Sequence, residues 1–294
     1  MHRYLLTPLL ASVLLAAASP PATPASPAEI VARAPAAAWR AVDPDNLLVM
    51  DLANGRHVAM ELAPGFAPVH VANIKALVRA HWFDGSAVVR VQDNYVVQWA
   101  ATGESRPLPA GVVAHPHAEY DRPAAGLAVR PLGYRDAYAP QVGHAEGWPV
   151  ASDGRRTWLT HCYGMLGVGR DMAPDTGNGA ELYTVIGQAP RHLDRNVALV
   201  GRIVDGIEGL TALPRGTGDL GFYTDPKMDL TISRVQLASD MPIADRPRYQ
   251  VMRSESPAFA AYVAARANRH DAFFVHPAGA IDLCNAPVPT RRAP

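Results

Sequence analysis

The sequence predicts a mainly β protein in which short antiparallel strands form a barrel or a sandwich. Two observations support this prediction: many short apolar runs are separated by turn residues, and few segments have helical periodicity. Of the 294 residues, 49% are hydrophobic, which is enough for a sizeable core. Lysine plus arginine and aspartate plus glutamate both number 27, and no basic cluster stands out. The composition therefore argues against nucleic-acid binding.

The first predicted elements are a hairpin and a helix. Two apolar runs, 47–52 and 57–62, flank Asn54-Gly55, a dipeptide that two-residue hairpin turns prefer because both positions tolerate positive φ. Apolar and polar residues alternate over 57–62, so the second strand should have one buried face. Pro68 then suits the first turn of a helix. Apolar residues recur at helical spacing after it, at Val71, Ile74, Leu77 and Val78.

The later elements are mostly strands. The segment 88–99 returns to strand, and the pattern predicts further strands within 164–169, 180–187, 196–206 and 227–239, with a short helix at 206–213. Between them, residues 102–161 contain seven prolines and predict a long loop with one hairpin near 124–133. No internal repeat is visible.

Beyond the strands, Ser256 is suited to cap a helix that begins at Pro257. We expect an accessory helix there, packed on the barrel, and a strand within 269–284. The chain has two cysteines, Cys162 and Cys284. An even pair in an oxidising compartment allows one disulfide, and two isolated thiols are the alternative.

The first residues have the layout of a secretory signal peptide. A short basic start precedes an apolar stretch from Leu5 to Ala18, and small residues follow. We expect a signal peptide over 1–18, a periplasmic or secreted mature protein, and no stable membrane association after cleavage. Residues 19–45 are rich in proline and alanine, and we expect a linker that does not pack.

Three segments, in order, resemble the signature regions of the cyclophilin family of peptidyl-prolyl isomerases. They are "FAPVHVANIKALV", "VVRVQDNYVVQWA", and "GMLGVGRDMAPDTGNGAELYTV" followed by "HLDRNVALVGRIVDGIEGL". The resemblance implies a closed eight-stranded antiparallel barrel capped by two helices, over 46–240. Residues 102–161 would then be an insertion and 241–294 a C-terminal extension.

The same resemblance implies the site. Arg90 matches the family's catalytic arginine, and Gln98 matches the glutamine that orients it. The implied substrate-binding residues are Tyr95, Val96, Gly169, Arg170, Glu181, Tyr183, His192 and Leu193. Several positions depart from the family pattern: Arg170 replaces an asparagine, Glu181 a glutamine, His192 a tryptophan and Val197 the pocket histidine. The departures concern substrate affinity and preference more than the fold.

These residue types suit rotation about an Xaa-Pro bond, which is slow because it breaks amide resonance. In the twisted transition state the proline nitrogen regains a lone pair, so an N–H donor aimed at it acts only there. A guanidinium is always charged and supplies several N–H donors. The reaction needs no cofactor or metal. The expected partners are proline-containing segments of exported proteins.

Three alternatives remain open at this stage. A catalytically weak or inactive barrel of the same fold could hold proline-containing segments as a chaperone or interaction module. A metal site is a second alternative, because histidines and carboxylates gather in the middle of the chain, at His115, His117, Glu119, Asp121, His144 and His161. Their spacing matches no closed structural zinc site. An arginine that only makes a salt bridge on a barrel strand is the alternative for Arg90.

Overall fold

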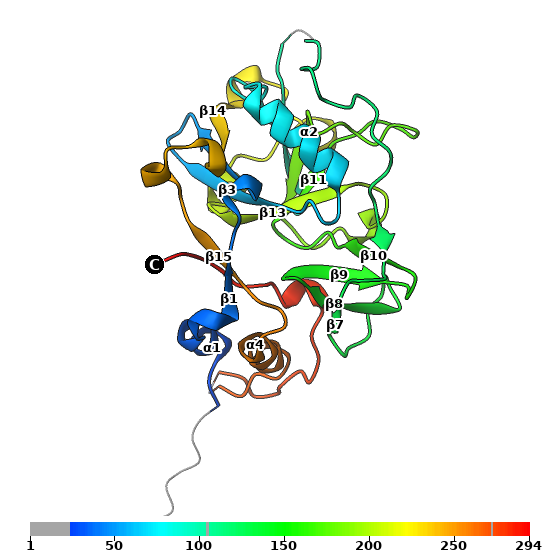
Figure 1. Ribbon diagram of the computed structural model, residues 1–294, viewed down its shortest axis with the longest axis vertical. Coiled ribbons are helices and arrows are strands. Elements are labelled where there is room, and N and C mark those ends of the chain that lie inside the picture. The colour runs from blue at the N-terminus through cyan, green and yellow to red at the C-terminus, as the bar shows by residue number, and fades with distance from the viewer. Residues whose placement is uncertain (1–23, 104–105, 272) are drawn as a thin grey trace, which may run out of the picture.

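The computed structural model describes residues 24–103, 106–271 and 273–294, so the expected signal peptide lies outside the described residues. Eight antiparallel strands close into a barrel in the order β11-β12-β5-β4-β14-β2-β3-β13 (Figure 1). Their bounds are β2 Leu47–Leu52, β3 His57–Leu62, β4 Ala87–Val91, β5 Val96–Ala100, β11 Met165–Val168, β12 Leu182–Val185, β13 Leu199–Asp205 and β14 Leu230–Leu237. The prediction of a closed eight-stranded antiparallel barrel is confirmed.

Two helices contribute to the core of this barrel. The longer one, α2 (Pro68–Arg79), begins at the predicted proline and lies across the barrel in Figure 1. Its predicted apolar face is buried, and Ile74 and Leu77 have no exposed surface. The short α3 (Glu208–Thr211) adds Leu210 to the same apolar cluster. Burial of this stripe is what stabilises a helix of this length in water.

The hairpin β2–β3 forms at Asn54-Gly55, with Asp51 opposite His57, but the predicted two-residue turn is wrong. The Leu52 N–H donates to the carbonyl of Arg56 across a three-residue loop, and of the pair only Gly55 has a positive φ, at +81°. The expectation of a single buried face on β3 is wrong, because Ala59 and Glu61 are buried as well. A layer outside the barrel covers this second face. Glu61 is therefore a buried carboxylate and needs cationic partners.

Arg40 and Arg202 supply those partners to Glu61, at 2.5 Å and 2.6 Å. Burial alone would raise the pKa of Glu61, but the two guanidiniums outweigh burial and lower it. Arg202 also donates to the carbonyl of Gly147 at 2.6 Å. This cluster joins the barrel to residues both before it and within the insertion.

Residues 102–161 are more ordered than a loop with one hairpin, and that expectation is wrong. They form a five-stranded sheet in the order β6-β10-β9-β8-β7. The strands are β6 Arg122–Pro123, β7 Arg130–Pro131, β8 Gln141–Ala145, β9 Trp148–Ser152 and β10 Arg156–Leu159. Pro123 and Pro131 lie on the two outermost strands, where a missing N–H is tolerated. The strands are short and prolines lie in or beside several of them, so the alternation of apolar and polar residues is not visible in the sequence.

The segment before the barrel also packs, which corrects the expected linker for residues 24–45. It contains α1 (Pro27–Arg33), capped by Ser26 and Glu29, and β1 (Trp39–Ala41). Strand β1 pairs with β15 (Tyr249–Met252), which pairs with β16 (Thr290–Arg292). The apolar partners of this segment come from the far end of the chain, so local composition could not predict the packing.

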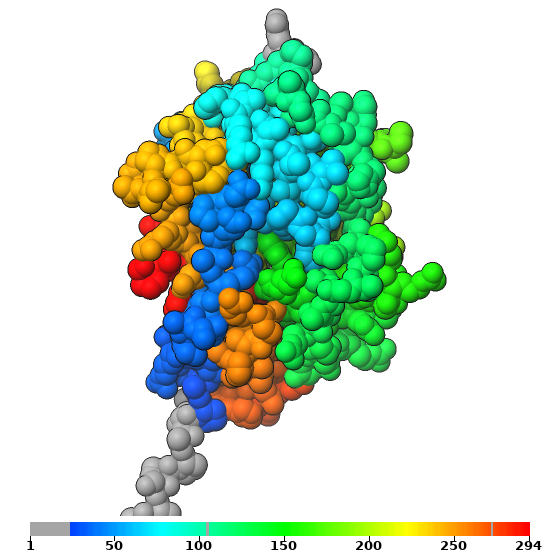
Figure 2. Space-filling view, viewed as in Figure 1, coloured from blue at the N-terminus to red at the C-terminus, as the bar shows by residue number. Residues whose placement is uncertain are grey.

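The C-terminal extension supplies those partners. Helix α4 (Pro257–Ala267) starts after the predicted cap Ser256, so the predicted helix is confirmed. It packs mainly against α1, β1 and β15, and not on the barrel as expected. Phe259 and Tyr262 of α4 pack with Trp39, and Figure 2 shows the N-terminal and C-terminal segments side by side on one face. The expected strand within 269–284 is absent from the described residues of that segment. Within the described ranges no helix is long and apolar enough to cross a membrane.

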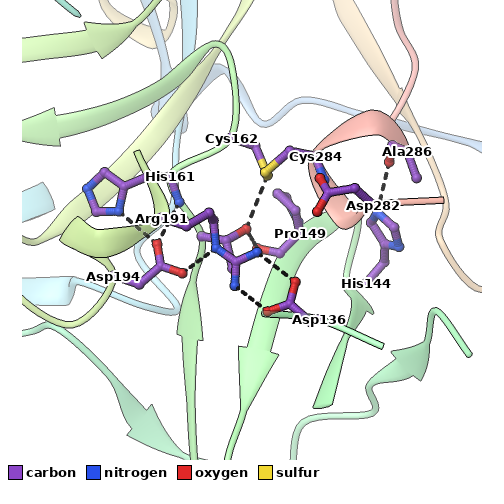
Figure 3. The surroundings of a disulfide bond; sticks show 11 residues. Asp136, His144, Pro149, His161, Cys162, Arg191, Asp194, Asp282, Cys284 and Ala286 are labelled. Atoms are coloured by element: carbon purple, nitrogen blue, oxygen red, sulfur yellow. Dashed lines mark hydrogen bonds and ion pairs between the residues drawn. A yellow bond between two sulfur atoms is a disulfide. The ribbon is translucent and has the colours of Figure 1, made fainter. Parts of the chain in front are cut away.

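Cys162 and Cys284 form a disulfide, so the two alternatives for the cysteines are decided (Figure 3). Cys162 follows the insertion directly, and Cys284 lies in the C-terminal extension. The bond closes a loop between residues 122 positions apart. It therefore ties the insertion to the C-terminal layer beside the barrel.

Candidate active site

A cleft of about 410 Å³ opens on the outer side of the barrel between β4, β5, β11 and β12 and the turns next to them. Its lining combines an apolar floor with a few charged and polar side chains at the rim. The lining residues are Arg90, Tyr95, Val96, Gln98, Val168, Gly169, Arg170, Asp171, Met172, Tyr183, Leu193 and Val197. A mostly apolar hollow with a few convergent polar groups is typical of a ligand site.

Strand pairing places the central residues in one row. Arg90 on β4 lies opposite Gln98 on β5, and Gln98 lies opposite Tyr183 on β12. Tyr183 in turn lies opposite Gly167 on β11. Directly opposed residues in an antiparallel sheet point to the same face, so the row presents Arg90, Gln98 and Tyr183 to the cleft together.

The segment 88–99 is a hairpin, which corrects the prediction of a single strand. Residues 92–95 form the turn, in which the Tyr95 N–H donates to the carbonyl of Gln92, and Asn94 has φ +51°. Arg90 and Gln98 share a face because they are cross-strand partners, with a bulge between Val88 and Arg90, and not because of period-two spacing along one strand.

Arg90 is only partly buried, and three groups hold its guanidinium. Nε donates to the carbonyl of Leu220 at 2.7 Å, Nη1 donates to Gln98 Oε1 at 2.8 Å, and Nη2 donates to Gln92 Oε1. A guanidinium carries five N–H groups, so one N–H on each Nη remains without a partner among the described residues. Burial lowers the pKa of Arg90, while Tyr95 and Glu181 oppose that shift. Its ordinary value is so high that the group stays charged.

Gln98 is 7% exposed, and its amide has a defined orientation. Oε1 accepts from Arg90, and Nε2 donates to Glu181 Oε1. A carboxylate can only accept, so Glu181 requires the NH₂ end of the amide to face it. Glu181 thereby keeps the carbonyl end of Gln98 turned toward Arg90.

Aromatic rings flank the Arg90 guanidinium. Its central carbon lies 5.8 Å from the ring centre of Tyr95 and 5.2 Å from that of Phe222. Tyr95 also stacks on His192 with a ring separation of 6.3 Å. Such cation–π contacts are worth about 0.5–1 kcal/mol at exposed sites and more where water is excluded. They hold the charged group against an apolar surface without removing it from the cleft.

The floor of the cleft is an apolar cluster of Val96, Tyr183 and Val185, against which Tyr95 and Val197 pack. Tyr183 is 6% exposed, whereas its neighbour Leu182 points into the barrel core. Gly167 allows the ring to lie close to β11, because a Cβ at Gly167 would stand 2.3 Å from Cζ of Tyr183. A side chain at that position would push the ring out into the cleft.

The hydroxyl of Tyr183 points away from solvent. Oη lies 2.8 Å from Nε2 of His161, and Nδ1 of His161 lies 3.0 Å from Oδ1 of Asp194. Burial lowers the pKa of His161 although Asp194 opposes the shift, so the ring is neutral near pH 7. Because Asp194 accepts, Nδ1 carries the proton, and Nε2 accepts from the tyrosine O–H. Burial also raises the pKa of Tyr183, which stays protonated.

One wall of the cleft is the turn after β11. Gly169 lies so close to Glu181 that a Cβ there would stand 2.7 Å from Glu181 Cγ. Arg170 donates to the carbonyls of Asn196 and Asp171, at 3.0 Å and 2.6 Å. Met172 is 86% exposed at the rim. The wall therefore presents a guanidinium and a flexible apolar side chain to whatever enters the cleft.

Eight of the ten residues expected from the sequence line the cleft. The other two lie just behind it: Glu181 holds Gln98, and His192 stacks on Tyr95. Sequence reasoning did not identify Gln92, Leu220, Phe222 or the role of His161. Leu220 and Phe222 come from a turn without periodicity, and no local signal marks them as neighbours of Arg90.

The residues considered for a metal site have other partners or lie apart. Glu119 pairs with His70 at 2.7 Å, and Asp121 pairs with Arg156 at 2.5 Å. His144 donates to the carbonyl of Ala286 at 3.0 Å. Among the described residues no group of three or more histidine, cysteine, aspartate or glutamate side chains could hold a metal ion.

Comparisons with known proteins agree with this geometry. Residues 48–237, about two thirds of the chain, match the family model described as cyclophilin type peptidyl-prolyl cis-trans isomerase. A curated relative from Brucella suis biovar 1, named probable peptidyl-prolyl cis-trans isomerase, is 25% identical over 177 residues, which cover 60% of this chain and 76% of the relative.

Solved structures are similar as well. The crystal structure of cyclophilin AquaCyp293 from Hirschia baltica superposes with a TM-score of 0.69 at 26% identity, covering 86% of this chain and 93% of that one. A cyclophilin from Cryptosporidium parvum, crystallised in the presence of the dipeptide Ala-Pro, matches with a TM-score of 0.42 at 14% identity, covering 65% of this chain and 98% of that one. The coverage of AquaCyp293 shows that the similarity extends beyond residues 48–237.

Proposed function

Because this chain belongs to the cyclophilin-type peptidyl-prolyl cis-trans isomerases, we propose that it catalyses rotation about Xaa-Pro bonds in exported proteins and that Arg90 is its catalytic donor. The observation that carries the assignment of Arg90 is its setting. Three of its N–H groups are held by the protein, the two others have no partner among the described residues, and Arg90 lines an apolar cleft. The alternative of a merely structural salt bridge does not account for this arrangement.

In the planar ground state the proline nitrogen shares its lone pair with the carbonyl and is a poor acceptor. When the bond twists, the lone pair returns to nitrogen, and an N–H of Arg90 donates to it. The donor is already oriented by Gln98 and Leu220, so little reorganisation is needed when the charge develops. Each tenfold gain in rate requires only about 1.4 kcal/mol of stabilisation specific to the transition state.

The pyrrolidine ring of the substrate would rest on Tyr183, Val96 and Leu193 at the floor of the cleft. Burial of apolar surface provides binding that is about equal in the ground state and the transition state. Arg90 then provides the difference between the two states on which catalysis depends. Arg170 and Met172 at the rim would contact the residues that precede the proline.

The proposal that the substrates are exported proteins rests on the expected signal peptide. The disulfide between Cys162 and Cys284 supports it, because disulfides persist mainly in oxidising compartments. Mass spectrometry of the native protein tests export directly. We expect a mature chain that begins after about residue 18, recovered from the periplasm or the medium, and an intact Met1 in a cytosolic fraction would contradict export.

A protease-coupled assay on the purified mature protein tests the activity. A chromogenic peptide that is cleaved only when its prolyl bond is trans should show faster conversion of the cis form with added protein. Binding of the peptide without acceleration would instead support the alternative of a holding module. The same assay on Arg90→Ala connects the activity to the proposed donor.

A further inference from the structure

A chain of buried polar groups leads away from the underside of the proline pocket. The Tyr183 hydroxyl donates to Nε2 of His161 at 2.8 Å, and Nδ1 of His161 donates to Asp194 at 3.0 Å. The side chain of His161 has no exposed surface, and that of Asp194 is 7% exposed. His161 and Asp194 do not touch the reacting atoms, so the proposed mechanism does not explain why these buried polar groups are present.

The network of hydrogen bonds and ion pairs continues into the insertion. Asp194 pairs with Nε of Arg191 at 2.5 Å, and Nη1 of Arg191 pairs with Asp136 at 3.0 Å (Figure 3). Asp136 belongs to the 102–161 segment, and its carboxylate also accepts from the backbone N–H groups of Tyr138 and Ala139. Burial alone would lower the pKa of Arg191, but the two carboxylates outweigh burial and raise it.

His161 itself is held at the junction of three parts of the fold. Its backbone N–H donates to Asp194 at 2.9 Å, and the next residue, Cys162, is bonded to Cys284 of the C-terminal extension. Its ring lies nearly parallel to that of Tyr183, at an angle of 10°. His161 is thus the last residue of the insertion, and Asp194 from the connection between β12 and β13 holds both its backbone N–H and its imidazole.

We propose that His161 is a positioning residue for the proline pocket, because it binds the Tyr183 hydroxyl beneath the floor of the cleft. The ion pairs from Asp194 through Arg191 to Asp136 link the position of His161 to the insertion. The inference rests on the proposed function. The insertion thereby supplies the hydrogen-bond acceptor for the Tyr183 hydroxyl on the side away from the substrate. The ring of Tyr183 can then form an apolar floor.

The physical argument concerns water. Without an acceptor at position 161, the Tyr183 hydroxyl can reach water only if the ring turns toward the cleft, where water is available. In the free protein that exchange is inexpensive. A bound proline removes the water from the floor and leaves the hydroxyl unpaired, so the loss appears when the peptide binds. A phenylalanine at position 183 has no hydroxyl and removes this dependence.

The test is a double-mutant cycle on His161→Leu and Tyr183→Phe, with affinity for an Ala-Ala-Pro-Phe peptide measured by NMR titration and KM and kcat measured in the coupled assay. We expect His161→Leu to weaken the affinity and raise KM about tenfold, with kcat changed less than about threefold. In the Tyr183→Phe background the same change should alter affinity less than about twofold. Tyr183→Phe alone supplies the reference affinity, KM and kcat for that background.

The matched control is His144→Leu. His144 is a second buried histidine, 2% exposed, that donates to a backbone carbonyl away from the cleft. Its loss should lower the free energy of unfolding without changing peptide affinity. Asp136→Asn weakens the ion pair with Arg191 and is the substitute variant if His161→Leu does not fold. It should weaken affinity about two- to threefold, and only where Tyr183 keeps its hydroxyl.

Equal losses of affinity in both backgrounds would refute the positioning role, because the effect would then not pass through the hydroxyl. Unchanged affinity in His161→Leu would refute it as well. A wild-type protein that binds the peptide but does not accelerate isomerisation would contradict the proposed isomerase activity, and the affinity cycle would still decide the role of His161. A wild-type protein that does not bind the peptide would contradict both proposals.

Discussion

Replacement of Arg90 by alanine is the most direct test of the proposed mechanism, because the structure separates its effect on activity from its effect on stability. The guanidinium is partly exposed, and its three partners either face the cleft or lie in an exposed turn. Water can replace most of these contacts, so we expect the free energy of unfolding to fall by only about 1–2 kcal/mol. A typical domain remains folded after such a loss.

The effect on activity should be much larger. Removal of one preorganised donor that acts on developing charge commonly lowers the rate about 10²–10³-fold, which corresponds to about 2.7–4 kcal/mol. Arg90→Lys keeps the charge but cannot bind Leu220, Gln98 and the substrate in the same geometry. We therefore expect the lysine variant to recover only a minor part of the lost kcat/KM.

The assay is protease-coupled isomerisation, with urea unfolding measured on the same preparations. Arg234→Ala is the matched control, because it also removes an arginine from a barrel strand but lies outside the cleft. It should leave kcat/KM unchanged. Turnover of Arg90→Ala at the wild-type rate would refute the donor role. Loss of activity together with unfolding would mean that Arg90 mainly supports the fold.

Three further predictions concern groups behind or away from the cleft. Glu181→Ala should lower kcat/KM about fivefold or more, because the Gln98 amide loses its acceptor and is free to flip, and the coupled assay measures this. Replacing Cys162 and Cys284 by serine together should lower the free energy of unfolding by about 2–5 kcal/mol with kcat/KM retained, as urea titration and turnover would show. His144 has its pKa lowered from 6.5 to about 4 by burial, so its contribution to stability is full above pH 6.5 and is lost as pH falls toward 4. Between pH 7.5 and 4.5, urea unfolding should show a loss of stability that is smaller in His144→Leu by on the order of 2–3 kcal/mol, and an unchanged pH dependence in that variant would contradict the assignment.

Local signals in the sequence were sufficient for the elements whose causes are local. Gly55 fixes the β2–β3 turn because few residues other than glycine accept positive φ, and Pro68 with its apolar stripe specifies α2. The closed barrel and most of the cleft residues were implied by the resemblance of three segments to the cyclophilin family, and not by a local signal. Ser256 predicted the start of α4 because a helix cap is formed by residues next to each other in the sequence.

Tertiary structure alone decided the features that depend on residues far apart in the chain. Leu220 reaches Arg90 across 130 positions, and the Cys162–Cys284 bond spans 122. The insertion and the N-terminal segment looked unstructured because proline and alanine dominate their composition, yet each is buried against partners from distant elements. His161 appeared in the sequence only as one of several histidines. Its hydrogen bond to Tyr183 exists because the insertion, the barrel and the C-terminal extension meet there, and no local pattern specifies such a junction.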